Sequence, residues 1–143
     1  MDIALCTDLG WLLSEEAFLI YASCMYKPSF AEFKTHIESC IDDPFVKIYV
    51  CAAGGERAGI LILRKQDPIS EVVGIAVSQR FRRRGIGKSM LLRVTEKEQL
   101  TAIKAETDED AIGFYQKCGF SEAKEIHEYP DGKAVRYICC LHV

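Results

Sequence analysis

The stretch RFRRRGIGKS, residues 80–89, is the most informative part of this sequence. It follows segment 71–77, whose small and β-branched residues predict a strand covered on both faces, and it opens a segment with apolar residues at helical spacing. Gly85 and Gly87 let the backbone turn tightly and bring its N–H groups close to a ligand, and the start of the following helix adds positive potential. Together with the arginines and Lys88, this strand, loop and helix predict a site for a pyrophosphate carried by a nucleotide or a coenzyme. A solvated basic turn is the alternative interpretation.

Two common nucleotide-binding patterns do not fit this stretch. GIGKS is similar to the end of a Walker A loop, but that loop needs a glycine five residues before Gly87, where Arg82 stands. The dinucleotide pattern GxGxxG fails as well, because Met90 takes the place of its third glycine. These departures disfavour nucleotide hydrolysis and dinucleotide binding.

Outward from this stretch, the sequence predicts a mixed α/β sheet with helices on both faces. Two helices are expected after the first strand: Leu12, Glu16 and Leu19 share a spacing on one, and Ser29 caps the other. Two more helices are expected, one after Gly85 and one over residues 111–118. The predicted strands cover residues 3–6, 46–53, 58–63, 71–77, 102–106, 120–129 and 135–141.

Composition limits the class of protein. The chain has 143 residues, of which 49% are hydrophobic and 27% charged, which predicts one folded domain over residues 1–143. A net charge of −3 argues against a nucleic-acid partner, and no apolar run approaches the roughly 20 residues that span a bilayer. The seven cysteines are odd in number and lack metal-ligand spacing, which predicts free thiols, no metal site and a cytoplasmic protein. A nucleophilic cysteine paired with a histidine is a disfavoured alternative.

Two motifs resemble the GNAT superfamily of N-acetyltransferases. Residues 82–87, RRRGIG, fit the pattern Q/R-x-x-G-x-G/A of that family's acyl-CoA loop. Further along, residues 111–120, AIGFYQKCGF, look like the family's A-x-x-F-Y-x-K-x-G-F segment between a helix and a strand. Motifs and element order cover roughly residues 46–141. The resemblance implies a central, mostly antiparallel sheet with helices on both faces, splayed between its fourth and fifth strands, where Gly74 is expected to mark a bulge.

The resemblance also implies acetyl-CoA as a co-substrate, with no metal. The pantetheine is expected to lie beside the fourth strand, and Phe114 to contact it or to belong to the core. Asp108 stands where the family commonly has an asparagine that bonds the coenzyme; aspartate lacks the amide donor, so a helix cap is the alternative. The expected coenzyme-binding residues are Ile75, Ala76, Val77, Arg82, Arg83, Arg84, Gly85, Ile86, Gly87, Lys88, Ser89, Asp108 and Phe114.

The implied chemistry is direct attack of an amine on the acetyl carbonyl. Tyr115 is expected to protonate the leaving thiolate, and a core tyrosine is the alternative. Glu71 is the base that the resemblance implies, since histone-modifying members of the family carry a catalytic glutamate six residues before the position of Val77. Period-two alternation predicts Glu71 on the same face as Val73, Ile75 and Val77. A solvated Glu71, or Glu106 or Asp108 acting through water, are the alternatives.

An acetyl-CoA-dependent N-acetyltransferase is therefore the expected function, and a non-catalytic acyl-CoA-binding sensor or interaction module is the alternative. The amine acceptor is left open between a small molecule, such as a polyamine, and a protein amine, and a homodimer is also left open. Acidic residues before the second strand would suit a cationic acceptor but equally form a solvated helix face; they are Glu15, Glu16, Glu32 and Glu38.

Overall fold

The computed structural model describes residues 3–66, 69–130 and 132–142. Its strands are β1 (Ile3–Cys6), β2 (Val46–Ala53), β3 (Glu56–Arg64), β4 (Ser70–Val77), β5 (Ala102–Thr107), β6 (Ser121–Tyr129) and β7 (Gly132–His142). Its helices are α1 (Leu9–Leu12), α2 (Glu15–Tyr21), α3 (Phe30–Asp42), α4 (Ile86–Lys97) and α5 (Ile112–Lys117), with 3₁₀ turns η1 (Ala22–Cys24) and η2 (Gln79–Phe81).

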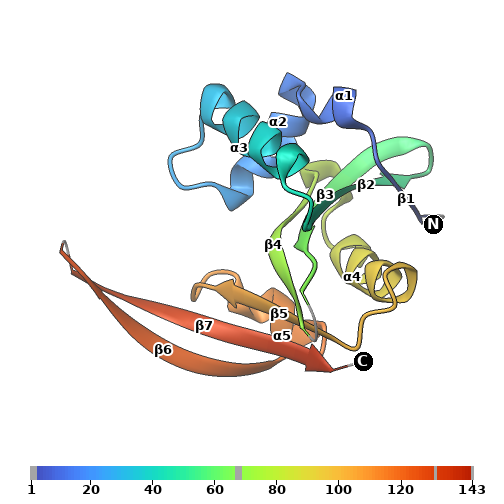
Figure 1. Ribbon diagram of the computed structural model, residues 1–143. Coiled ribbons are helices and arrows are strands. Elements are labelled where there is room, and N and C mark those ends of the chain that lie inside the picture. Colours follow the sequence, from blue (N-terminus) through green and yellow to red (C-terminus); the bar gives the residue numbers. More distant parts are fainter. Residues whose placement is uncertain (1–2, 67–68, 131, 143) are drawn as a thin grey trace.

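The described strands form one sheet in the order β1-β2-β3-β4-β5-β7-β6. The β4–β5 pair is parallel and is connected through α4, while the other pairs within the described residues are antiparallel. Figure 1 shows α1, α2 and α3 on one side of the sheet and α4 with α5 on the other. The predicted mixed sheet, mostly antiparallel and covered on both faces, is confirmed.

Alternating side chains of the central strands build two separate cores. On β2, Tyr49 and Cys51 pack with the residues of α4, whereas Ile48 and Val50 pack with those of α1, α2 and α3. This alternation follows from the pleat of a strand, which points successive side chains to opposite faces. Each helical layer therefore rests on its own apolar face of the same sheet.

The N-terminal helical region differs from the prediction at one point. A single first helix carrying Leu12 and Leu19 on one side was expected, but α1 ends at Leu12 and α2 begins after Ser14. Ser14 causes the break, because its hydroxyl caps α2 by accepting the Ala17 N–H at 3.2 Å. Leu12 is fully buried while Leu19 is 69% exposed, so the helical stripe drawn across both segments was wrong. The helix capped by Ser29 is confirmed.

A β-bulge in β4 changes the course of the sheet. Ile62 of β3 pairs with Gly74 and the next residue, Leu63, pairs with Val72, so Val73 has no partner on β3. Beyond this bulge β4 also separates from β5. Pairing of the two strands runs from Ser70 to Val72 and stops there, although β4 continues to Val77. The predicted splay between the fourth and fifth strands is confirmed, and its bulge lies directly before Gly74.

Gly74 is required by the close approach of a tyrosine. A Cβ atom at this position would lie 1.9 Å from the hydroxyl oxygen of Tyr21, a buried residue of α2. The phenol of Tyr21 therefore fills the space that a side chain on residue 74 would take. This contact holds α2 against the bulged part of β4.

The far end of α4 is fixed by a buried carboxylate. Glu98, at the helix C-terminus, has a side chain only 6% exposed and pairs with Lys47 at 3.1 Å and Lys65 at 3.0 Å. The Tyr49 hydroxyl also donates to it. Burial alone raises the pKa of Glu98, but the hydrogen bonds from Tyr49, Lys65 and Lys47 outweigh this effect and lower the pKa to about 2.

Replacing Glu98 with Gln is expected to lower the free energy of unfolding by about 2 kcal/mol at neutral pH, because hydrogen bonds to a charged group contribute about 1.5–3 kcal/mol. Since the folded-state pKa lies below the ordinary 4.5, this stabilisation is complete above about pH 5 and is lost as the pH falls toward 2. Urea titrations at several pH values between 6 and 3 measure the effect. The exposed Glu96→Gln is the matched control, and a deficit that does not shrink at low pH would contradict the assignment.

Candidate functional site

An open groove of about 1120 Å³ lies where β4 and β5 diverge. Both helical layers contribute to its walls: Ser23 and Cys24 come from η1, and Tyr115 comes from α5. The loop before α4 closes one end, and Arg136 of β7 lies on the wall beyond β5. The splay of the sheet therefore opens a space that elements from both faces can reach.

Most of the residues predicted for the site lie on this groove. Those that line it are Ile75, Ala76, Val77, Arg82, Arg83, Gly85, Ile86, Gly87, Lys88, Asp108, Phe114 and Tyr115. Three predicted residues, Glu71, Arg84 and Ser89, are not part of its lining.

The loop at the groove's end has the backbone of an anion site. Gly85 adopts φ +74° immediately before α4, and Arg83 adopts φ +64°, which is uncommon for a residue with a side chain. Helix α4 has no acidic residue in its first turn and no side-chain cap, so its first N–H groups have no partner from the helix itself. The Ser89 amide, by contrast, is bonded to the Gly85 carbonyl at 3.0 Å. Amides from the first turn and the positive end of α4 thus face the groove.

The arginines of the loop divide into two groups. Arg80 pairs with Glu56 at 3.4 Å and Arg84 lies over the ring of Phe81, and neither arginine lines the groove. Arg82, Arg83 and Lys88 line the groove and make no ion pair with another described residue, although the Arg82 Nε–H donates to the Val77 carbonyl at 3.2 Å. Three positive charges are thus left for a ligand at the same end as the helix amides.

Gly87 has a different role from the one its sequence pattern indicates. A Cβ atom there would lie 2.7 Å from Cε1 of Phe114, so only glycine allows the α5 residue to pack this closely against the start of α4. Its φ is not in the left-handed region, unlike that of Gly85. Gly85 therefore allows the backbone to turn before α4, and Gly87 leaves space for the ring of Phe114.

Tyr115 is a buried residue with a free hydroxyl. It is 7% exposed and packs edge-on against Phe114 and Phe120, with ring centroids 5.1 and 5.3 Å away. Its hydroxyl makes no hydrogen bond to any other residue that the structure describes. Burial raises the pKa of Tyr115, so the phenol stays protonated and is able to donate a proton or a hydrogen bond into the groove.

Glu71 lies on the opposite face from the one predicted. It pairs in register with Arg64 of β3, and its carboxylate is 3.7 Å from the Lys104 ammonium. Val73 packs on the α1–α3 side, whereas Ile75 and Val77 pack on the α4 side. The bulge at Val73 shifts the alternation by one residue, so the prediction that Glu71, Ile75 and Val77 share a face was wrong.

The other two candidate carboxylates have protein partners. Glu106, on β5, pairs with Arg136 at 3.3 Å. The Asp108 carboxylate accepts the Ala111 N–H at 3.0 Å in the turn before α5; the N-cap residue of that helix is Ala111 and has no side-chain cap, so Asp108 fixes the preceding turn and does not take the predicted role of a helix cap. Both still line the groove.

Sequence analysis missed Cys24, which lines the groove. Its thiol donates to the main-chain carbonyl of Ile75 at 2.9 Å. The two residues are 51 positions apart, and no local pattern connects them. Arg136 falls within none of the motifs either, and its position follows from the pairing of β7 with β5.

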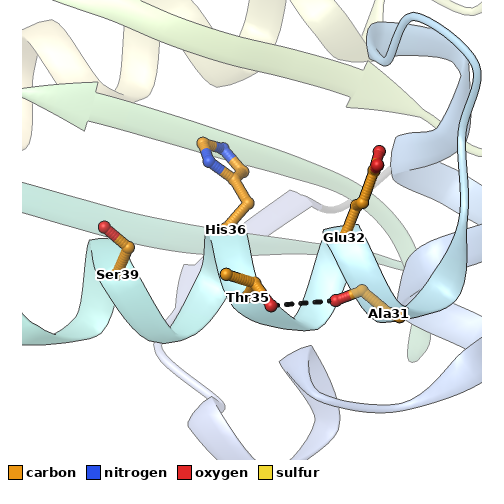
Figure 2. Close-up of a pocket in the computed structure, with 5 residues that line it drawn as sticks. All are labelled: Ala31, Glu32, Thr35, His36 and Ser39. Atoms are coloured by element: carbon orange, nitrogen blue, oxygen red, sulfur yellow. Dashed lines mark hydrogen bonds between the residues drawn. The ribbon is translucent and has the colours of Figure 1, made fainter.

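A smaller hollow of about 440 Å³ lies on α3 (Figure 2). Glu32 and His36 project from the helix there, and the Thr35 hydroxyl is bonded to the Ala31 carbonyl at 3.1 Å. His36 stacks on Tyr21, and burial lowers its pKa. Glu32 belongs to this hollow, and none of Glu15, Glu16, Glu32 and Glu38 lines the groove. The described lining of this hollow contains a carboxylate and no lysine or arginine, so it is the weaker candidate for an anionic ligand.

No helix in residues 3–66, 69–130 and 132–142 is long and apolar enough to cross a membrane. Over the same residues, no cluster of histidine, cysteine, aspartate and glutamate has the arrangement of a metal site.

Known proteins resemble this chain in sequence and in fold. The uncharacterized N-acetyltransferase YvbK of Bacillus subtilis is 34% identical over 90 residues, a match that spans only 57% of this chain and 57% of that protein. The ribosomal-protein-S18-alanine N-acetyltransferase of Escherichia coli has the same fold, with a TM-score of 0.72 at 19% identity over 99% of this chain and 94% of its own. An acetyltransferase of Bacillus subtilis in complex with CoA gives a TM-score of 0.67 at 23% identity over 99% and 97%.

The family assignment follows from the sequence itself. The model of the Acetyltransferase (GNAT) family matches residues 11–120, which include the whole of the splayed strand, the glycine loop and α5. The chain therefore belongs to the GNAT family of acetyltransferases.

Proposed function

We propose that this protein transfers the acetyl group of acetyl-CoA to a primary amine by direct attack of the amine on the thioester. The observation that carries the proposal is the split between β4 and β5, which has an anion-binding loop at one end and the protonated phenol of Tyr115 along its wall. Membership of the GNAT family supports the same reaction class. A similar fold in complex with CoA gives further support.

The coenzyme would lie along the splayed half of β4. Its pyrophosphate would bind the first amides of α4 together with Arg83 and Lys88, which have no ion pair within the described chain. From there the pantetheine would follow residues 75–77, whose main-chain groups no longer pair with β5. Tyr115 and Phe114 would close the groove over its sulfur end.

Tyr115 is the proposed general acid. Departure of the coenzyme as a thiolate requires a proton donor next to the sulfur, and burial keeps this phenol protonated at neutral pH. The phenol has no hydrogen-bond partner of its own among the described residues, which leaves the proton available.

Glu71 stays the proposed base, now on a geometric argument. It lies one residue before the last β4–β5 pair, at the closed end of the splay, and on the face covered by α1, α2 and α3. Tyr115 belongs to the other layer. Attack from one side of the thioester and departure toward the other suit a base and an acid on opposite faces of a split sheet. Glu106, one step further along β5, is the alternative base.

The acceptor is a small amine or a protein amine, since neither the groove nor the family distinguishes the two. A non-catalytic coenzyme sensor is the second candidate function, favoured by Asp108, whose carboxylate is bonded to the Ala111 N–H and offers no amide donor to the coenzyme. A cytoplasmic location is proposed from the odd set of unpaired cysteines.

Calorimetric titration with acetyl-CoA is expected to saturate at one site per chain. The double variant Arg83→Ala/Lys88→Ala should weaken binding by at least about 100-fold, because each lost charge-assisted contact costs about 1.5–3 kcal/mol. Arg80→Ala, whose side chain pairs with Glu56 outside the groove, is the matched control and should bind normally. ATP should give no saturable heat. Unchanged binding by the double variant would place the pyrophosphate elsewhere.

Tyr115→Phe is expected to lower kcat roughly 100-fold while the Kd for acetyl-CoA changes little, since loss of a general acid costs about 10²–10⁴ in rate. The assay follows acetylated product by mass spectrometry with a polyamine, a peptide with a free amino terminus and a lysine peptide. Tyr26→Phe, which alters a tyrosine that is 87% exposed, is the control. Full activity of the Tyr115 variant would remove the acid role, and tight coenzyme binding without turnover of any amine would favour the sensor.

Glu71→Gln and Glu106→Gln separate the two candidate bases. If Glu71 is the base, its variant should lose at least about tenfold in kcat at pH 7 and recover in part at higher pH, where more of the amine is already neutral. Glu106→Gln should then stay close to wild type. The reverse result would move the base to β5.

A further inference from the structure

Besides Cys118, which also lines the groove, Cys24 is a free cysteine there that the proposed reaction does not use. It lies in η1, on the side of the sheet covered by α1, α2 and α3, and opens on the groove opposite α5. Its thiol is held in place by the 2.9 Å hydrogen bond to the Ile75 carbonyl. Ile75 belongs to the part of β4 that has left β5, so the sulfur atom lies at the split itself.

A second, independent feature points to a ligand at the same place. Tyr115 is 7% exposed, lines the same groove and has no partner for its hydroxyl within the described residues. Cys24 lines the same groove, so a phenol without a described partner and a fixed thiol both open on the split.

The proposed path of the coenzyme suggests which atom would occupy that part of the split. With a pyrophosphate at the start of α4, a pantetheine that follows β4 backward from Val77 would run past Ile75, which lines the groove. The end of a pantetheine is a sulfur atom, and the atom that Ile75 already holds is the sulfur of Cys24. The two sulfurs would meet at the same carbonyl.

We propose that Cys24 is a site of covalent modification by coenzyme A, in which its sulfur forms a mixed disulfide with the coenzyme held in the groove. The inference rests on the proposed function, because it requires that the groove bind coenzyme A. The co-reactant is coenzyme A disulfide. The Cys24 thiolate attacks one sulfur of the disulfide, the S–S bond breaks, a new S–S bond joins Cys24 to the bound half, and the other half leaves as a thiolate that takes up the proton lost by Cys24.

The surroundings make this reaction selective. Burial raises the pKa of Cys24, with smaller opposite effects from the Ile75 hydrogen bond, Ser23 and Arg82, so the thiol is mostly protonated at neutral pH. A thiol of this kind reacts slowly with a disulfide that arrives by collision. A disulfide bound in the groove is instead held next to the thiol. This proximity raises the reaction rate and compensates for the small fraction of Cys24 that is present as thiolate.

The chain supplies its own matched control. Cys6 is also exposed, and its thiol also donates to a main-chain carbonyl, that of Val50, at 3.7 Å. It lies on β1, at the other end of the sheet, and does not line the groove. Both cysteines are thus exposed and each donates to a main-chain carbonyl, but only Cys24 lines the groove.

The experiment treats the reduced protein with coenzyme A disulfide or glutathione disulfide and follows each cysteine by intact mass and peptide mapping. Cys24 is expected to react about tenfold or more faster with coenzyme A disulfide than with glutathione disulfide, and excess acetyl-CoA should suppress that reaction. Cys6 should show no preference. The adduct should abolish calorimetric binding of acetyl-CoA in wild type and in Cys6→Ser, and dithiothreitol should restore it. Cys24→Ser should keep binding after the same treatment.

The outcomes separate this inference from the proposed function. If acetyl-CoA binds but Cys24 reacts equally with both disulfides, or no faster than Cys6, the inference is overturned and the proposed function stands. If acetyl-CoA does not bind the untreated protein, both are overturned. A Cys24 adduct that leaves acetyl-CoA binding intact would also overturn it, because the modified sulfur would then lie outside the coenzyme's path.

Discussion

The single unpaired residue in β4 is the constraint on which the rest of this structure depends. Val73 has no partner on β3, and from that point β4 bends away from β5. A regular strand would have continued its pairing to Val77 and left no space between the halves of the sheet. The bulge creates the groove, releases Ile75 from pairing with β5 so that its carbonyl accepts the Cys24 thiol, and requires a glycine at position 74 because Tyr21 lies against it. Fold and site therefore have one common cause.

The bulge also distributes chemistry between the two faces of the sheet. In a regular strand, the side chains of Glu71 and Ile75 would point to the same face of the sheet. The bulge between them reverses this, so Glu71 belongs to the layer of α1, α2 and α3 while Ile75 belongs to that of α4. The helices of the first layer come from the N-terminal part of the chain and those of the second from the C-terminal part. A ligand in the split is therefore reached from both, and its two sides meet different parts of the sequence.

Sequence alone predicted the elements and the loop because their signals are local. Gly85, the first turn of α4 and the apolar alternation of β2 depend on neighbouring residues, and the splay followed from the family resemblance. The predictions that failed depend on contacts between distant residues. The face on which Glu71 lies depends on the bulge in the pairing of β3 with β4, and the position of Cys24 depends on a carbonyl 51 residues away. Ser14 was a local signal too, but its cap was overlooked in favour of a longer helical stripe.

The sheet order carries a mechanical consequence. Strands β1 to β4 form one plate and β5, β7 and β6 form another, and the seam between the plates consists of three residue pairs, from Ser70 to Val72. Little main-chain bonding resists opening along this seam. A molecule bound in the split contacts both parts of the sheet at once and therefore holds them together. Ligand binding and the stability of the sheet are therefore coupled. A ligand in the groove raises the free energy of unfolding of the whole domain by an amount that grows with the logarithm of its concentration over its dissociation constant.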